Sequence, residues 1–282
     1  MRALHGLLGT LAPLIAVACG GTTLTASSGD TTGASSSSTG GAGATTTSAS
    51  TAASSTASSS SGGGGGAGGA SAGMTIAFGG TVVQVPVNVL LSSVQICVDQ
   101  HPEIACETTD SAGAFTMMVP ANAEIAVTLA KPGYAGIVVP IVTSTLDETQ
   151  WEIGLPTSSS TASFYGATYP DSAHGFLSLY TNPAANAQEG EAGVVPSMSP
   201  SSGEGPLYAG TSLQTPDPTL QATSSVGNAR FAGVAPGTVE LTLGPSTLTC
   251  TPTFGGWSAP VANAARVPIL AGFETHVGFS CQ

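Results

Sequence analysis

The sequence has few charged residues, and basic ones are the scarcest. Lys and Arg together number 4 of 282 residues, and charged residues make up 7% of the chain. Proteins that bind nucleic acids neutralise phosphates with clustered Lys and Arg, so nucleic-acid binding is excluded. The same shortage disfavours attraction to anionic lipid headgroups. Helical proteins use charged side chains on their solvent faces, so a surface of Ser, Thr and Gly indicates strands and turns.

Familiar catalytic and metal-binding motifs are also missing. The chain has no H-x-H, H-E-x-x-H or C-x-x-C spacing for a metal, and its G-x-S-x-G sequence, residues 69–73, lies in the Gly- and Ser-rich linker and follows no predicted strand, as a nucleophile elbow would. We therefore expect no catalytic residue, no metal and no cofactor. A secreted hydrolase or metal-dependent enzyme remains the remote alternative, and its candidate groups would be Asp171 with His174 and the carboxylate pairs Asp147/Glu148 and Glu189/Glu191.

Residues 1–19 predict an export signal. Arg2 precedes an apolar run, Leu7–Ala18, that is too short to cross a bilayer. Ala16–Cys19 resembles the bacterial lipobox, with Ala16 where Leu is usual. The resemblance implies a diacylated Cys19 at the mature N-terminus, and Gly20 in place of Asp implies the outer membrane. An ordinary secretory signal is the alternative. Without Arg2 the mature chain carries 16 acidic residues against 3 basic ones.

Residues 20–74 predict a disordered linker. From Gly20 to Gly73 every residue is Gly, Ala, Ser or Thr except Leu24 and Asp30. Such a segment has no apolar surface to bury and so cannot offset the entropy lost on ordering. A flexible coil of about 55 residues separates its ends by roughly 40 Å. We expect a tether that links the folded part to the membrane, and O-glycosylation of its hydroxyls is an open alternative.

Apolar and polar residues alternate in three later segments, 124–130, 238–244 and 273–281. This period of two predicts strands half-buried in antiparallel sheets. In the last segment the alternation places Phe273, Val277 and Phe279 inward, and Glu274 and His276 on the polar side. No helix is predicted after the signal, so the fold class is all-β.

The first two of these segments follow similar sequences. A turn, an aromatic residue (Phe115 or Phe231), and a Pro-marked hairpin precede each strand, which suggests two copies of one unit about 115 residues apart. The first copy contains the sequences Asp110-Ser111-Ala112-Gly113-Ala114-Phe115, Val119-Pro120 and Lys131-Pro132-Gly133-Tyr134. In these residues it resembles the carboxypeptidase regulatory-like domain. Asn122 departs from the glycine usual in that family, but Asn tolerates positive φ.

The resemblance implies a transthyretin-like β-sandwich without catalytic activity. We therefore expect two small antiparallel β-sandwich domains of transthyretin or immunoglobulin type, at 75–157 and 174–282, joined by a connector at 158–173. The second is a divergent repeat, since it lacks the Asp and the Gly-Tyr. Carbohydrate binding is the activity most often associated with that superfamily.

The remaining four cysteines, Cys97, Cys106, Cys250 and Cys281, form an even set in an exported chain, so disulfides are expected. Cys97 and Cys106 flank a turn, so they suit a disulfide that closes a hairpin. Cys250 and Cys281 would then join late strands of the second domain. Pairing across the domains is the alternative.

Four aromatic residues are the candidate ligand contacts: Trp151, Trp257, Tyr165 and Tyr169. Trp151 and Trp257 flank turn-rich segments, where they could stack on sugars or plug the ends of a sandwich. The leading hypothesis is a non-enzymatic, lipid-anchored envelope protein with a structural or protein-interaction role. The alternative is a carbohydrate-binding surface module, favoured if these aromatic residues line a shallow groove.

Overall fold

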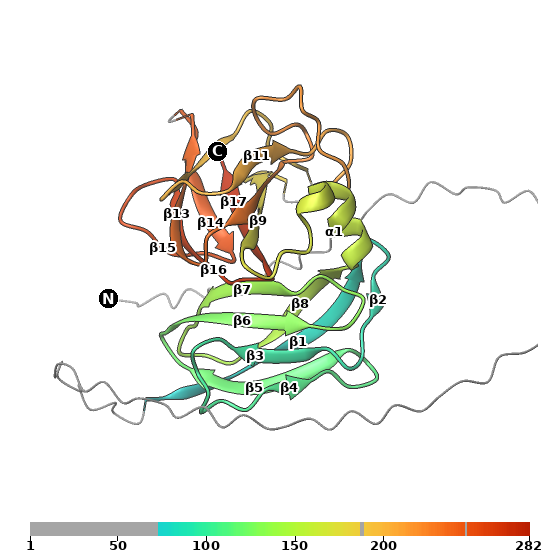
Figure 1. Cartoon of the computed structure of the whole chain (residues 1–282). Coiled ribbons are helices and arrows are strands. Elements are labelled where there is room, and N and C mark those ends of the chain that lie inside the picture. Colours follow the sequence, from blue (N-terminus) through green and yellow to red (C-terminus); the bar gives the residue numbers. More distant parts are fainter. Residues whose placement is uncertain (1–72, 187–188, 246) are drawn as a thin grey trace, which may run out of the picture. The chain divides into compact units, whose positions relative to one another are not determined.

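A computed structural model describes residues 73–186, 189–245 and 247–282, which belong to one compact unit. The predicted signal, Cys19 and nearly all of the predicted linker lie outside these residues. Strands β1–β17 form three sheets, and the fold is all-β as predicted (Figure 1). No helix in the described ranges is long and apolar enough to cross a membrane.

The first two sheets have four strands each. One contains β2 (Val89–Leu90), β1 (Thr75–Val85), β5 (Ala114–Pro120) and β8 (Glu148–Pro156). The other contains β10 (Val195–Ser199), β13 (Gly237–Gly244), β16 (Ala264–Ile269) and β15 (Trp257–Ser258).

The third sheet has nine strands and is shared by both halves of the protein. Its order is β11 (Glu204–Tyr208), β12 (Asn228–Val234), β9 (Gly175–Pro183), β17 (Glu274–Cys281), β7 (Ile137–Val142), β6 (Glu124–Ala130), β3 (Gln95–Val98) and β4 (Glu107–Thr108), with β14 (Cys250–Phe254) also paired to β17. Glu274 and Thr275 pair with Ile137 and Val138, and this short parallel contact joins the halves.

Both halves share one strand topology. In the first, β1 pairs antiparallel with β5 and parallel with β8, while β6 pairs antiparallel with β3 and β7. In the second, β9 pairs antiparallel with β12 and parallel with β17, while β13 pairs antiparallel with β10 and β16. Each half is a β-sandwich with its own apolar core, in which Phe115 and Phe231 are buried.

Two local predictions are wrong. The Pro-marked segments do not close hairpins, because β5 and β6 lie in different sheets, as do β12 and β13. Each segment instead carries the chain from one layer of its sandwich to the other. The chain also forms a helix after the signal, α1 (Ser158–Tyr165), followed by the 3₁₀ turn η1 (Gly166–Thr168). Thr157 caps α1 by accepting a hydrogen bond from Ser160 N, and Phe164 and Tyr165 bury its apolar side.

Candidate functional site

The two tryptophans, although far apart in the sequence, line one groove. Its volume is about 560 Å³, within the range of about 300 to 1,000 Å³ that is usual for small-molecule sites. Strands β7, β8, β14 and β15 and the first residue of β16 contribute to it, together with the loop after β15. The lining residues are Pro140, Ile141, Val142, Trp151, Thr249–Ala259 and Val261–Ala264.

Trp257 is held against the first half of the protein. Its Nε1 donates a 3.1 Å hydrogen bond to the carbonyl of Ile125, and the Arg266 guanidinium lies 5.9 Å from the ring centroid. Arg266 itself forms an ion pair with Glu124. Gly255 makes the preceding turn feasible, since it has φ +70° and a Cβ there would lie 1.9 Å from the carbonyl oxygen of His276. The turn therefore directs β15, and with it Trp257, toward β6.

Trp151 is positioned by a close approach between the backbones of β1 and β8 in the first sandwich. A Cβ on Gly80 would lie 1.9 Å from the Trp151 carbonyl oxygen, so glycine lets β8 pack directly beside β1. The indole is half-buried, and its centroid lies 5.8 Å from that of Phe78 in the core. Packing against Phe78 thus fixes Trp151, which is half-buried and lines the groove.

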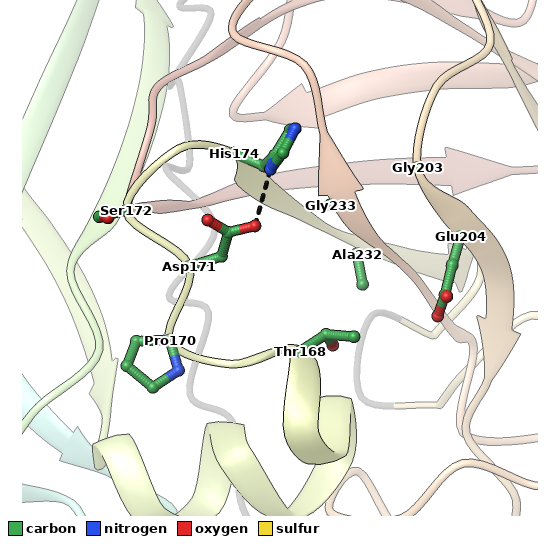
Figure 2. Close-up of a pocket in the computed structure, with 9 residues that line it drawn as sticks. All are labelled: Thr168, Pro170, Asp171, Ser172, His174, Gly203, Glu204, Ala232 and Gly233. Atoms are coloured by element: carbon green, nitrogen blue, oxygen red, sulfur yellow. Dashed lines mark hydrogen bonds and ion pairs between the residues drawn. The ribbon is translucent and has the colours of Figure 1, made fainter.

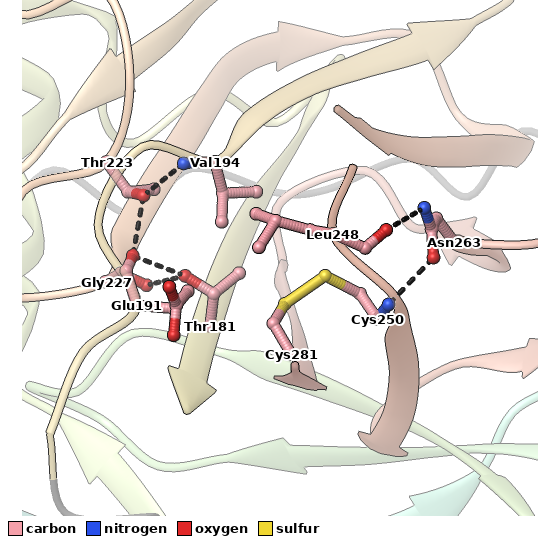
Figure 3. The surroundings of a disulfide bond; sticks show 9 residues. All are labelled: Thr181, Glu191, Val194, Thr223, Gly227, Leu248, Cys250, Asn263 and Cys281. Atoms are coloured by element: carbon pink, nitrogen blue, oxygen red, sulfur yellow. Dashed lines mark hydrogen bonds between the residues drawn. A yellow bond between two sulfur atoms is a disulfide. The ribbon is translucent and has the colours of Figure 1, made fainter. Parts of the chain in front are cut away.

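A disulfide stiffens one wall of the groove. Cys250, which begins β14, is bonded to Cys281 at the end of β17, and Cys97 is bonded to Cys106. Both disulfides expected from the cysteine pattern are therefore present. Figure 3 shows Asn263 beside the Cys250–Cys281 disulfide. The Nδ2 of Asn263 donates to Leu248 O at 2.8 Å, and its Oδ1 accepts from Cys250 N at 2.7 Å. These contacts hold the start of β14 in place.

A second hollow, of about 500 Å³, contains the Asp171–His174 segment. His174 Nδ1 lies 2.7 Å from Asp171 Oδ2, and the backbone N–H of Ala173 together with His174 lowers the pKa of Asp171. In Figure 2, Ser172 and Glu204 stand apart from this pair. Across the described ranges no three His, Cys, Asp or Glu side chains are grouped to hold a metal ion. The pair orients an imidazole at the surface.

The predicted carboxylate pair Asp147/Glu148 has local roles in the fold. Asp147 Oδ1 accepts the backbone N–H of Ala77 at 2.8 Å, and Glu148 Oε1 accepts that of Ser144 at 2.9 Å. These bonds hold the loop that leads into β8.

Tyr165 and Tyr169 do not reach the groove. Tyr165 is only 6% exposed, and its hydroxyl donates a 2.8 Å hydrogen bond to Glu274 Oε1. Tyr169 is half-buried and packs edge-on against Phe176, with ring centroids 5.1 Å apart. Both residues cover the outer face of the nine-stranded sheet with α1 and η1, which makes Tyr165 inaccessible to a ligand.

Beneath Tyr165 lies a buried ion pair that the alternation pattern did not predict. Arg230 Nη1 is 3.5 Å from Glu274 Oε1, and Arg230 also lies over the Phe164 ring at 4.2 Å. Glu274 Oε2 and His276 Nε2 are 3.3 Å apart and buried, without hydrogen-bonding geometry. The alternation places Glu274 on a polar face, but α1 covers that face, so Glu274 is 1% exposed. A lone Arg inside the apolar run of β12 is the only sequence signal for this pair.

The charge on Glu274 is stabilised despite its burial. Desolvation alone would raise the pKa of this carboxyl, but Arg230, His276 and the Tyr165 hydroxyl outweigh it and lower the pKa to about 2. Burial and the neighbouring Glu274 raise the pKa of Tyr165 well above its ordinary value, so its hydroxyl stays a donor.

Because of Glu274, the free energy of unfolding is expected to fall in acid. The folded-state pKa of about 2 is below the ordinary value of 4.5, so this contribution is complete above pH 4.5 and is lost as the pH falls toward 2. The difference corresponds to about 3 kcal/mol. Urea unfolding between pH 2 and 6 should show a steeper decline for the native chain than for Glu274→Gln. Parallel curves would contradict the assignment.

The fold defines a class: a disulfide-bonded, all-β protein built of two β-sandwiches. No protein-family model and no curated protein matches the chain. Among solved structures it is similar to the TIE protein of Bacillus anthracis (12% identity, TM-score 0.24), covering 74% of this chain and 34% of that one. It thus spans about a third of the TIE protein.

Two pilins give similar values. GBS52, the minor pilin of Streptococcus agalactiae, is 12% identical at a TM-score of 0.22, covering 72% of this chain and 95% of that one. The shaft pilin SpaA of Lactobacillus rhamnosus GG is 12% identical at a TM-score of 0.23, covering 73% and 97%. Likeness at this level assigns no site and no activity to this chain.

Proposed function

We propose that this chain is an exported, lipid-anchored envelope protein whose paired sandwiches serve a structural or protein-interaction role without catalysis. The carrying observation is that all four cysteines after residue 19 are paired in disulfides. Disulfides persist in oxidising compartments, which supports export. The lipobox-like Ala16–Cys19 supports acylation, and Gly20 supports the outer membrane as the destination.

The proposal includes the assignment of 75–157 to the carboxypeptidase regulatory-like domain and of 174–282 to a divergent second copy. Asp110 Oδ1 accepts the backbone N–H groups of Ala112 and Ala114, and Gly113 has φ +69°, as the resemblance requires. Asn122 has φ +51°, so it adopts the conformation of the glycine usual there. The equal strand topology of the halves supports the repeat, although the domain boundaries stay a prediction.

Lipid labelling tests the anchor. In a diderm bacterial host fed an alkyne-tagged fatty acid, the chain should take up the label and fractionate with the outer membrane. Cys19→Ala should abolish labelling because it removes the acylated thiol. Cys97→Ala combined with Cys106→Ala is the matched control and should keep the label. Label on the Cys19→Ala chain, or none on the native chain, would refute lipid anchoring.

The membrane to which the protein is sorted is tested separately with the substitution Gly20→Asp. By the sorting rule of this signal class, Asp after the lipidated cysteine should move the protein to the inner-membrane fraction, with labelling unchanged. Gly21→Asp is the matched control and should leave the protein in the outer-membrane fraction. Recovery of the native chain in the inner-membrane fraction would refute the assignment to the outer membrane, and an unchanged location of the Gly20→Asp chain would refute the role of residue 20 in sorting.

A further inference from the structure

We propose that the groove bounded by β7, β8, β14 and β15 binds a neutral, proline-rich segment of a partner protein in the polyproline II conformation. The inference names a partner chemistry for the protein-interaction role proposed above, on which it rests, and it is independent of the lipid anchor. Three features carry it: a lining without charge, strand edges that disfavour β-strand addition, and open side-chain donors beside two indoles.

The lining of the groove excludes charged ligands. None of its 19 residues is charged, although the chain carries 16 acidic residues and a net charge of −12. A cationic segment would find no carboxylate in the groove, and an acidic segment would be repelled by the chain as a whole. The segment that fits is therefore neutral.

The edge of β14 offers no backbone donor to an added strand. Thr249 and Gln282 exchange backbone hydrogen bonds of 2.9 and 3.0 Å. The alternation of the β14–β17 ladder then turns the backbones of Cys250 and Pro252 away from β17. The Cys250 N–H is already bonded to Asn263, and proline has no N–H. An extended strand therefore finds no donor at either position.

The edge of β7 offers a single donor within the groove. Thr143 N donates to Ala123 O at 2.9 Å, so the alternation of the β6–β7 ladder turns the backbones of Pro140 and Val142 away from β6. Of these two residues only Val142 has an N–H. Strand addition relies on successive main-chain hydrogen bonds along one edge, so both edges of the groove disfavour it.

A polyproline II segment does not need a row of backbone donors. This helix has no internal hydrogen bonds, so its carbonyl oxygens are free to accept. Proline has no N–H, so a proline-rich segment presents acceptors and few donors. The conformation also exists before binding, which lowers the entropy lost on association. Residues 20–73 of this chain contain no proline, so the segment belongs to a partner.

The two indoles supply the apolar contact that such a segment requires. Trp151 and Trp257 are both half-buried and line the groove. Trp151 packs against Phe78, and Trp257 is hydrogen-bonded to Ile125 O, so both rings are held in place before a ligand arrives. The C–H groups of a pyrrolidine ring pack on the negative face of an aromatic ring, and proline-rich segments dock in grooves lined by such rings.

Donors for the carbonyl oxygens lie in the same lining. The Trp151 Nε1–H has no hydrogen-bond partner among the described residues and is not a buried atom, so it is open to solvent. Thr251, Thr253 and Ser258 are exposed, and their hydroxyls are likewise not bonded to any described residue. These four groups can each donate one hydrogen bond to a carbonyl oxygen.

The lining is less suited to a sugar. A planar amide or carboxylate presents two adjacent hydrogen-bonding atoms, which suits the adjacent hydroxyls of a sugar ring. Asn263 has the only such side chain in the lining, and both of its ends are occupied, by Leu248 O and by Cys250 N (Figure 3). The groove therefore favours a ligand that only accepts hydrogen bonds.

The handedness of the polyproline II helix provides a direct test. The full chain, purified in a detergent without a sugar headgroup, would be titrated by calorimetry with acetylated and amidated nonaproline. The same peptide made of D-proline is the matched control, because it has equal composition but forms the mirror-image helix. We expect saturable binding of the L-peptide alone. Tryptophan emission should change with it, because the chain has two tryptophans and both line the groove.

Three variants then locate the site. Thr253→Arg places an unpaired cation in the groove and should weaken binding of L-nonaproline by about tenfold or more. Thr116→Arg makes the same change at an exposed position of β5 outside the lining and should leave the affinity unchanged. Trp151→Phe keeps an aromatic ring but removes the Nε1 donor, so it should weaken binding about threefold to tenfold, the usual effect of one hydrogen bond. Unaltered unfolding midpoints would show that all three chains are folded.

An alternating Thr-Val peptide and cellohexaose serve as the probes for strand addition and for sugar binding. The inference is overturned if L-nonaproline does not bind, if both mirror images bind equally, or if either of these two probes binds more tightly. Equal weakening by Thr253→Arg and Thr116→Arg, or full affinity of the Trp151→Phe chain, would overturn it as well. Lipid labelling is scored separately, so a failure here would leave the proposed envelope role intact.

Discussion

Replacing Arg230 with Ala is expected to lower the free energy of unfolding by about 3 to 5 kcal/mol. Arg230 and Glu274 are 9% and 1% exposed at their side chains, and the substitution leaves the carboxylate buried without its cation. The change also removes the cation–π contact with Phe164 at 4.2 Å. Urea denaturation with both disulfides intact would measure the loss.

The control for this substitution is the exposed pair of the same residue types. Arg266 and Glu124 are 39% and 35% exposed, so Arg266→Ala should cost no more than about 1 kcal/mol. Combining Arg230→Met with Glu274→Leu should recover much of the loss, because neither charge is then left buried. Equal effects of Arg230→Ala and Arg266→Ala would mean that the buried pair is not a stabilising contact.

Loss of the Cys250–Cys281 disulfide is expected to cost about 4 kcal/mol by the chain-entropy estimate. The two cysteines are 31 residues apart, whereas Cys97 and Cys106 are 9 apart, for which the same estimate is about 3 kcal/mol. Paired Cys→Ala variants of each bridge, unfolded in urea, would measure both losses. Because Cys250 begins one wall of the groove, the first variant should also shift tryptophan emission.

The Cys97–Cys106 variant is the matched control, since its cysteines do not line the groove. It should lose stability without a change in emission. The prediction fails if removing the 31-residue bridge costs less than about 1 kcal/mol, or if the emission shift is the same in both variants.

Strand positions could be read from the sequence because alternation is a local property. The segments 124–130, 238–244 and 273–281 correspond to β6, β13 and β17 within a residue. Sheet membership could not be read in this way. Turn residues such as Pro120 indicate where the chain changes direction, but not whether it returns to the same sheet.

The candidate site was only partly predictable for the same reason. Trp151 and Trp257 were identified by residue type, but their convergence depends on the β7–β17 pairing, which no local pattern encodes. Glu274 was assigned to solvent because alternation reports two faces of a strand and not what covers them. That cover, α1, begins with Ser and Thr, whose helix propensity is low, and it forms because of its cap and its buried Phe164 and Tyr165.

The place of β1 within its sheet has a mechanical consequence. The chain enters the fold at Thr75, and β1 is hydrogen-bonded along one edge to β5 and along the other to β8. Tension applied ahead of Thr75 therefore acts along the strand axis, and many hydrogen bonds must shear together before β1 can slide. At the other terminus, β17 lies between β9 and β14, and the Cys250–Cys281 disulfide passes a pull on Gln282 to both β17 and β14. Neither terminal strand can be peeled off one bond at a time, so the fold can bear load at both ends.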